Sequence, residues 1–151
     1  MNYSFDITLK TRAIFKNFLE TYNLDQLNKI PEGFSNTIYW NIKHIVITQQ
    51  LLTYSLSGLP TLISEVEIET FRKGSKAEAK ATNEDVELLK KQLFSTVEQT
   101  QKDYKNGKFT EFTSYTVSTK SVLSTIDEAL EFNNFHEGIH LGYILAMKKA
   151  I

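Results

Sequence analysis

The sequence predicts an all-α protein, a four-helix bundle with a long connection between helices 2 and 3. Two observations lead to this prediction. Apolar residues recur at the three-and-four spacing of amphipathic helices in four long segments, and turn or cap residues separate these segments. The one segment of strand-like composition, residues 109–120, has no evident partner strand. The length of 151 residues fits one core, so residues 1–151 are expected to form a single domain.

The first two helices are expected in the N-terminal third of the chain. Apolar residues mark one face of the first helix over residues 4–22, and residues 23–35 contain the proline and glycine of a connection. A second helix should begin at Ser35 or Asn36 and stop before Gly58. It is apolar nearly all round, which predicts a central position.

A long connection follows over residues 59–82, with a short helical turn expected at residues 66–71. The third helix should run from about residue 83 to 106, because Thr82 and Asp85 have the spacing of an N-terminal cap. Residues 109–120 are expected to form an ordered loop over one end of the bundle.

The last helix should begin near Ser124 or Thr125, with Glu128 completing a capping box. It is expected to continue to about Lys149, where the two final lysines suit the negative end of the helix dipole.

Composition and charge exclude several functional classes. Seventeen basic and 18 acidic residues give a net charge of −1 without long runs of one sign, so no nucleic-acid-binding face is expected. The absence of cysteine leaves imidazole and carboxylate as ligands for a transition metal. Without a secretory signal or a membrane-spanning apolar run, a cytoplasmic location with no membrane partner is the expectation.

The three histidines are the strongest functional signal. His136 and His140 are four residues apart, which places both imidazoles on one face of a helix and within reach of one ion. Phe132 and Met147 fall in the same row, which indicates that the pair points inward. His44 lies in the most apolar helix, where an unpartnered polar ring would be costly, and a bundle can place it opposite the pair. The alternative is that each histidine is a hydrogen-bonded core residue without a ligand role.

The segment from His136 to His140 also matches the His-Glu-x-x-His motif of zinc peptidases, in which the glutamate is a general base. Such peptidases take a third ligand from downstream, and no histidine, aspartate or glutamate follows His140. The third ligand must therefore come from upstream, as His44 would. Helix phase places Glu137 at the rim of the pocket or in solvent, with solvent the stronger expectation.

The sequence resembles the DinB/YfiT-like superfamily, most closely its bacterial DinB-like members. The resemblance covers essentially the whole chain and rests on residues 40–45, 125–130 and 134–144. It implies a four-helix bundle, often a homodimer, with a divalent metal held by three histidines. The histidines in the matching positions here are His44, His136 and His140, and nickel or zinc is the expected ion, with iron or manganese as further candidates. DNA binding is not implied by the family name.

Three neutral imidazoles leave coordination positions for water or substrate, as in catalytic zinc sites. The leading hypothesis is a metal-dependent enzyme that activates water or a low-molecular-weight thiol, either a hydrolase or an S-transferase, with a small-molecule substrate. Candidate pocket residues by helix phase are Trp40, Thr48, Glu137 and Tyr143. The alternatives are a non-catalytic metal- or ligand-binding stress-response protein and an interaction bundle with structural histidines.

Overall fold

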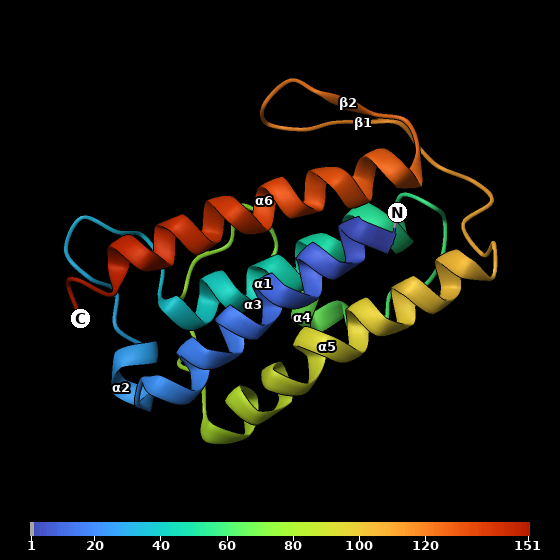
Figure 1. Ribbon diagram of the computed structural model, residues 1–151. Helices are drawn as coiled ribbons and strands as arrows, with labels where there is room; N and C mark the ends of the chain where they lie inside the picture. Colours follow the sequence, from blue (N-terminus) through green and yellow to red (C-terminus); the bar gives the residue numbers. More distant parts are fainter. Residues whose placement is uncertain (1) are drawn as a thin grey trace.

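Helices make up most of the chain, as the sequence predicts, in a computed structural model that describes residues 2–151 (Figure 1). The long helices in this range are α1 (Asn2–Thr21), α3 (Ile38–Gln50), α5 (Asn83–Lys105) and α6 (Ile126–Met147). Short helices in the connections are α2 (Leu24–Leu27) and α4 (Glu65–Phe71), and the π-helix η1 (Leu51–Ser55) continues α3 directly.

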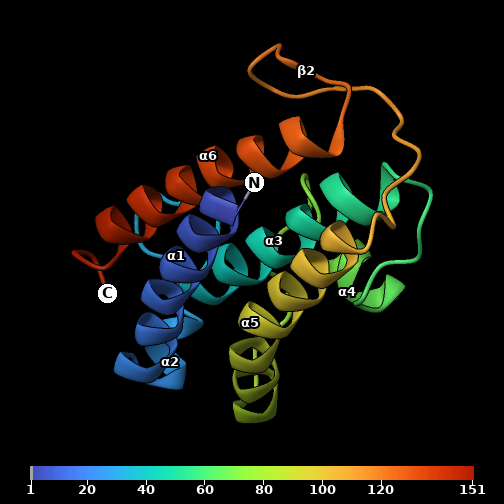
Figure 2. The same cartoon turned by 45° about the vertical axis from the view of Figure 1, so that its right-hand side comes forward.

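The long helices pack around one main core. Both α1 and α3 contact α5 and α6, and Figures 1 and 2 show α5 and α6 on opposite sides of the molecule with α1 and α3 between them. Phe15, Ile42, Leu89 and Ile144, one from each long helix, are completely buried in this core. Burial of each such side chain contributes about 1.5–3 kcal/mol. The core therefore fixes the position of α3 against α6.

The second predicted helix is central, as expected, because every residue of α3 except Thr48 is buried. Its first turn begins one residue later than predicted. Thr37 is the N-cap, and its hydroxyl oxygen accepts a hydrogen bond from the Trp40 amide at 2.9 Å. The Ser35 and Asn36 expectation was wrong because Thr37 is the residue whose side chain reaches the free amides of the first turn.

The other predicted caps are confirmed. Thr82 and Asp85 form a reciprocal capping box at the start of α5, and Thr125 and Glu128 form one at the start of α6. The final helix ends at Met147, with Lys148 as its C-cap.

Two local features differ from the sequence prediction. Residues 23–35, expected to be a plain connection, contain α2. The second helix does not end as an α-helix, because residues 51–55 form the π-helix η1. A π-helical turn widens the backbone and is frequent at functional sites. The short helix expected at residues 66–71 is present as α4.

The expectation that the segment 109–120 lacks a partner strand was wrong. Strand β1 (Tyr115–Thr116) pairs antiparallel with β2 (Val122–Leu123), which begins just beyond that segment. Figures 1 and 2 show this hairpin over the N-terminal part of α6. Val117 and Leu123 pack with Leu52 of η1 and Ala129 of α6. The hairpin is thereby anchored beside the π-helix.

A membrane-crossing helix needs about 20 predominantly apolar residues. None of the helices within residues 2–151 meets this requirement of length and apolarity.

Candidate metal centre

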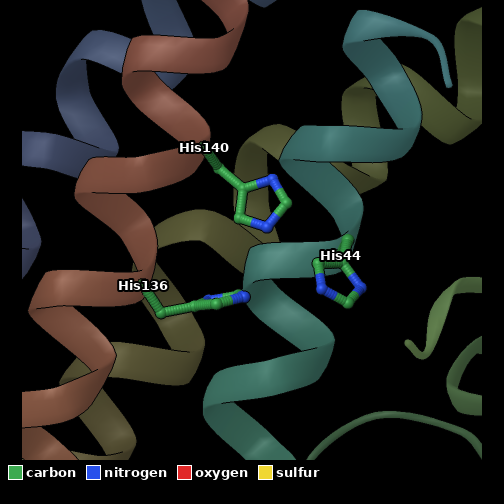
Figure 3. A group of neighbouring side chains, drawn as sticks. All are labelled: His44, His136 and His140. Atoms are coloured by element: carbon green, nitrogen blue, oxygen red, sulfur yellow. The ribbon is translucent and has the colours of Figure 1, made fainter. Parts of the chain in front are cut away.

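The three histidines lie together between α3 and α6. Each offers one ring nitrogen, and these nitrogens all lie within 4.8 Å of one another. Figure 3 shows His136 and His140 extending from α6 toward α3, which carries His44. The four-residue spacing on α6 aligns the two rings, and the core that packs α3 against α6 supplies the third. The sequence prediction that the histidines converge is confirmed.

Hydrogen bonds orient two of the three rings. Nδ1 of His44 lies 2.7 Å from the carbonyl oxygen of Phe71, and Nδ1 of His140 lies 2.8 Å from Oδ1 of Asn41. The amide nitrogen of Asn41 donates to the Thr37 carbonyl, which leaves its oxygen facing His140. Because a carbonyl oxygen can only accept, both Nδ1 atoms donate their protons. Nε2 of each ring is then the unprotonated nitrogen, as outer contacts of metal-binding histidines require.

His136 provides the test of whether an ion fits. Its Nδ1 is buried and has no hydrogen-bond partner among residues 2–151. A buried polar atom without a partner costs about 1–3 kcal/mol, and such atoms are rare in folded proteins. The three rings otherwise contact one another, with centroids 4.6–5.3 Å apart. A divalent ion among three neutral imidazole nitrogens suits this donor set, which lacks thiolate and carboxylate.

Burial keeps the histidine cluster neutral. Burial, reinforced by the proximity of the other two rings and of Arg12, lowers the pKa of His136 to about 3. Burial and the neighbouring His44 lower the pKa of His140 to about 4. Burial also lowers the pKa of His44, although the bond to the Phe71 carbonyl opposes the shift. Neutral imidazole is the form that binds a metal, so the site is ready for an ion at pH 7.

A partly buried ion pair joins α3 to α4 beside His44. Lys43, only 2% exposed, donates to the carboxylate of Glu67 and to the side-chain oxygen of Gln92. Burial alone would raise the pKa of the Glu67 carboxyl, but hydrogen bonds from Lys43, Gln92 and Ser64 outweigh it and lower that pKa to about 2. Glu67 belongs to the helix that ends at Phe71. The pair therefore holds the carbonyl that orients His44.

Two of the predicted pocket residues lie beside the histidines. The Trp40 ring stacks on His44 with centroids 4.6 Å apart and an interplanar angle of 9°. The Trp40 indole donates to the Ser75 hydroxyl at 3.2 Å. The Thr48 hydroxyl lies 3.2 Å from Nε2 of His44 and lines the adjacent cavity. Trp40 thus fixes the plane of one ring, and Thr48 lies next to the nitrogen that faces the cluster.

The expectation that Glu137 faces solvent was wrong, and Glu137 does not line the cavity beside the histidines. Its carboxylate is completely buried and accepts hydrogen bonds from Nε and Nη2 of Arg12, at 2.8–3.0 Å, and from Asn133 at 2.8 Å. Helix phase alone indicated the rim of the pocket or solvent for this carboxylate, and neither is observed. It could not show that α1 covers that side with a buried arginine.

Tyr143 lies away from the cluster. It is partly exposed, makes an edge contact with the Phe34 ring at 5.1 Å between centroids, and does not line the cavity. Helix phase made Tyr143 a candidate pocket residue, but its ring packs against Phe34 in the connection before α3.

A cavity of about 350 Å³ adjoins His44 and His136. Apolar walls come from the π-helix, the hairpin and the outer part of α6, with Leu52, Val117 and Ile139 as examples. A volume of this size accommodates a small molecule. The histidine cluster can therefore meet a ligand that enters beside the hairpin.

The sequence missed several residues that shape the centre. Asn41 lies three residues before His44, a spacing that puts both on one helix face and could have indicated a partner for a histidine. Arg12 lies in the apolar row of α1, where a buried cation demands a carboxylate. The contact of His44 with the Phe71 carbonyl could not be predicted from the sequence, because every residue type has a backbone carbonyl.

These features define a mainly helical protein with a three-histidine cluster that suits a divalent ion. The cluster lies beside an apolar cavity. Residues 8–144 match the DinB superfamily. The chain belongs to this superfamily, in agreement with the resemblance drawn from its sequence motifs. A comparison with curated proteins gave no match.

Proposed function

We propose that this chain is a metal-dependent enzyme in which His44, His136 and His140 hold one divalent ion, nickel or zinc. The reaction is hydrolysis or S-transfer to a small electrophile, with water or a low-molecular-weight thiol as the nucleophile. The convergence of three neutral imidazoles beside a cavity carries this proposal. A bound ion would supply a Lewis acid that lowers the pKa of the nucleophile.

The residues of the chain contribute orientation and exclusion of water. Phe71 and Asn41 hold two imidazoles with Nε2 toward the cluster, and Trp40 fixes the plane of His44. The apolar walls separate a bound substrate from bulk solvent, which strengthens electrostatic interactions at the reacting centre. The Thr48 hydroxyl is positioned to hydrogen-bond a nucleophile next to His44.

Glu137 is not assigned the role of general base. Its carboxylate is occupied by Arg12 and Asn133 and lies outside the cavity. This arrangement opposes a peptidase mechanism of the His-Glu-x-x-His type, where the glutamate must reach the attacking water.

The proposal includes the fold and assembly typical of the family. The long helices are taken to form one four-helix-bundle domain over residues 1–151, in a cytoplasmic homodimer. An exposed row on α6 supports the dimer, because Phe135, Ile139 and Leu145 present apolar surface there, and the first two of these also border the cavity beside the histidines. Gly138 and Gly142 lie in the same row and have open space around them, which allows close approach of a second helix.

The enzymatic role is tested by comparing loaded and chelated protein. Conjugation of 1-chloro-2,4-dinitrobenzene to cysteine and hydrolysis of p-nitrophenyl acetate represent the two reaction types. Turnover is expected in the zinc- or nickel-loaded chain, lost on chelation, restored by the metal and absent from His44→Ala. Glu84→Gln, on an exposed carboxylate of α5, is the matched control that should keep the activity. Turnover that survives chelation, or none in the loaded chain with either type, contradicts the proposed enzyme.

A further inference from the structure

The charged residues that line the cavity beside the histidines are all cations. Arg72 and Lys73 lie at its edge, and neither aspartate nor glutamate is among the lining residues. The chain as a whole has 18 acidic and 17 basic residues, so an acid-free lining is not a consequence of a basic composition.

The two cations are tied to the histidine cluster by the backbone. Phe71, whose carbonyl oxygen is 2.7 Å from Nδ1 of His44, directly precedes Arg72 and Lys73. The bond to His44 therefore holds this part of the chain at the edge of the cavity. The cations remain there by the same contact that orients a histidine.

Lys73 is the cation that is available to a ligand. Arg72 already pairs with Glu69 at 2.7 Å on its own helix. Lys73 makes no ion pair within residues 2–151, and its ammonium group donates to the Ser118 hydroxyl at 2.9 Å. Ser118 belongs to the tip of the hairpin, and it lines the cavity together with Thr119. An ammonium group and two hydroxyl groups form a donor set for a carboxylate or phosphate oxygen.

The remaining wall suits an apolar body. Leu52, Val117, Phe132 and Ile139 come from three separate elements and face the same space. A ligand that fills it buries apolar surface near His44 and His136 while its charged end stays at the solvent edge.

We propose that the cavity takes a small molecule with an apolar body and an anionic group, a carboxylate or a phosphate, bound by Lys73 and Ser118. This inference rests on the proposed function for the reacting end of the molecule, which lies at the histidines. The anionic end lies at the hairpin, away from the ion.

Binding of four probes that share one apolar body tests the inference. They are 4-phenylbutyrate, 4-phenylbutyl phosphate, 4-phenylbutan-1-ol and 4-phenylbutylamine, titrated calorimetrically into the full chain with and without one equivalent of zinc. At least one anion should bind about tenfold more tightly than the alcohol, the factor expected for a hydrogen bond to a charged group. The two anions distinguish a carboxylate subsite from a phosphate subsite. Alcohol and amine binding that equals or exceeds that of both anions overturns the inference.

Variants of Lys73 identify which end of the probe is recognised. Lys73→Met should remove the preference for the anion, and Lys73→Glu should transfer it to the amine. Lys76→Met, on an exposed lysine of the same connection outside this cavity, should behave as the wild type. A reversal of preference cannot result from misfolding. If the anion binds through zinc, the Lys73 variants will leave its affinity unchanged and the inference fails.

Failure of the proposed function is separable from failure of this inference. An anion preference that depends on Lys73, in a chain that fails to bind zinc when zinc is supplied, supports the subsite and contradicts the metalloenzyme. A chain that binds zinc through its histidines but shows no anion preference supports the metal centre and contradicts the anion subsite.

Discussion

Glu137→Gln is expected to destabilise the protein strongly, because it leaves the Arg12 guanidinium buried without a counter-ion. Both side chains are 0% exposed. The carboxylate accepts from Arg12 Nε at 2.9 Å and Nη2 at 2.8 Å, and from Asn133 at 2.8 Å. Breaking a buried pair from one side costs about 3–5 kcal/mol. For a chain of this size that corresponds to a fall in Tm of roughly 6–20 °C, at about 2–4 °C per kcal/mol.

The interaction is isolated by a double-mutant cycle measured by urea unfolding. Arg12→Met and Glu137→Met should each lose several kcal/mol, whereas the double variant should lose clearly less than their sum. The residual loss in the double variant includes about 1–3 kcal/mol for the Asn133 amide, which no longer has its acceptor.

Catalytic and structural roles for Glu137 predict opposite results. A general base in the cavity would give Glu137→Gln an unchanged Tm and an abolished activity. That outcome, or additive losses in the cycle, would refute the assignment of Glu137 to a structural pair with Arg12.

Three further predictions concern the candidate metal centre and α6, the helix that carries two of its histidines. In the metal-free chain the folded-state pKa values of His136 and His140 are about 3 and 4, below the usual 6.5. Between pH 6.5 and 4 the unfolded state therefore binds more protons, so stability should fall on acidification by up to about 1.4 kcal/mol per pH unit for each histidine. Urea unfolding from pH 7.5 to 4.5 measures this, and a profile identical to that of His136→Leu would contradict it. Asn41→Leu should weaken zinc binding by about 10–100-fold through loss of the His140 contact, and Asn41→Asp should restore the affinity. Competition with a chelating dye measures the zinc affinity of both variants. Wild-type affinity in Asn41→Leu would exclude a role for Asn41 in positioning His140. Thr125→Ala should cost about 1 kcal/mol of stability by removing the α6 cap, without changing metal content, and an unchanged unfolding midpoint would count against the cap.

The long helices were predictable from sequence because their signals are local. Periodicity identifies the buried face of a helix, and the capping boxes at Thr82 and Thr125 depend on residues only three positions apart. The hairpin was missed for the opposite reason. Its ladder pairs only two residues on each strand, and its stability comes from packing on η1 and α6 rather than from strand propensity.

The convergence of the three histidines was also predictable, because the four-residue spacing fixes two rings and the apolar helix indicates an inward direction for the third. The surroundings of the histidine cluster were not predictable. Contacts of His44 with a carbonyl on α4, and of Glu137 with Arg12 on α1, join residues far apart in the chain. Helix phase gives the direction of a side chain, but the element that covers it depends on tertiary packing.

Metal content after reconstitution tests the central claim most directly. The full chain is incubated with excess zinc or nickel, dialysed and measured by elemental mass spectrometry, alongside His44→Ala, His136→Ala and His140→Ala. Since the chain has only three histidines, Glu84→Gln serves as the control outside the cluster. One ion per wild-type and control chain, with little or none in each histidine variant, is the expected result. Absence of stoichiometric metal from the wild type, or metal that persists in all three histidine variants, would contradict a three-histidine metal centre.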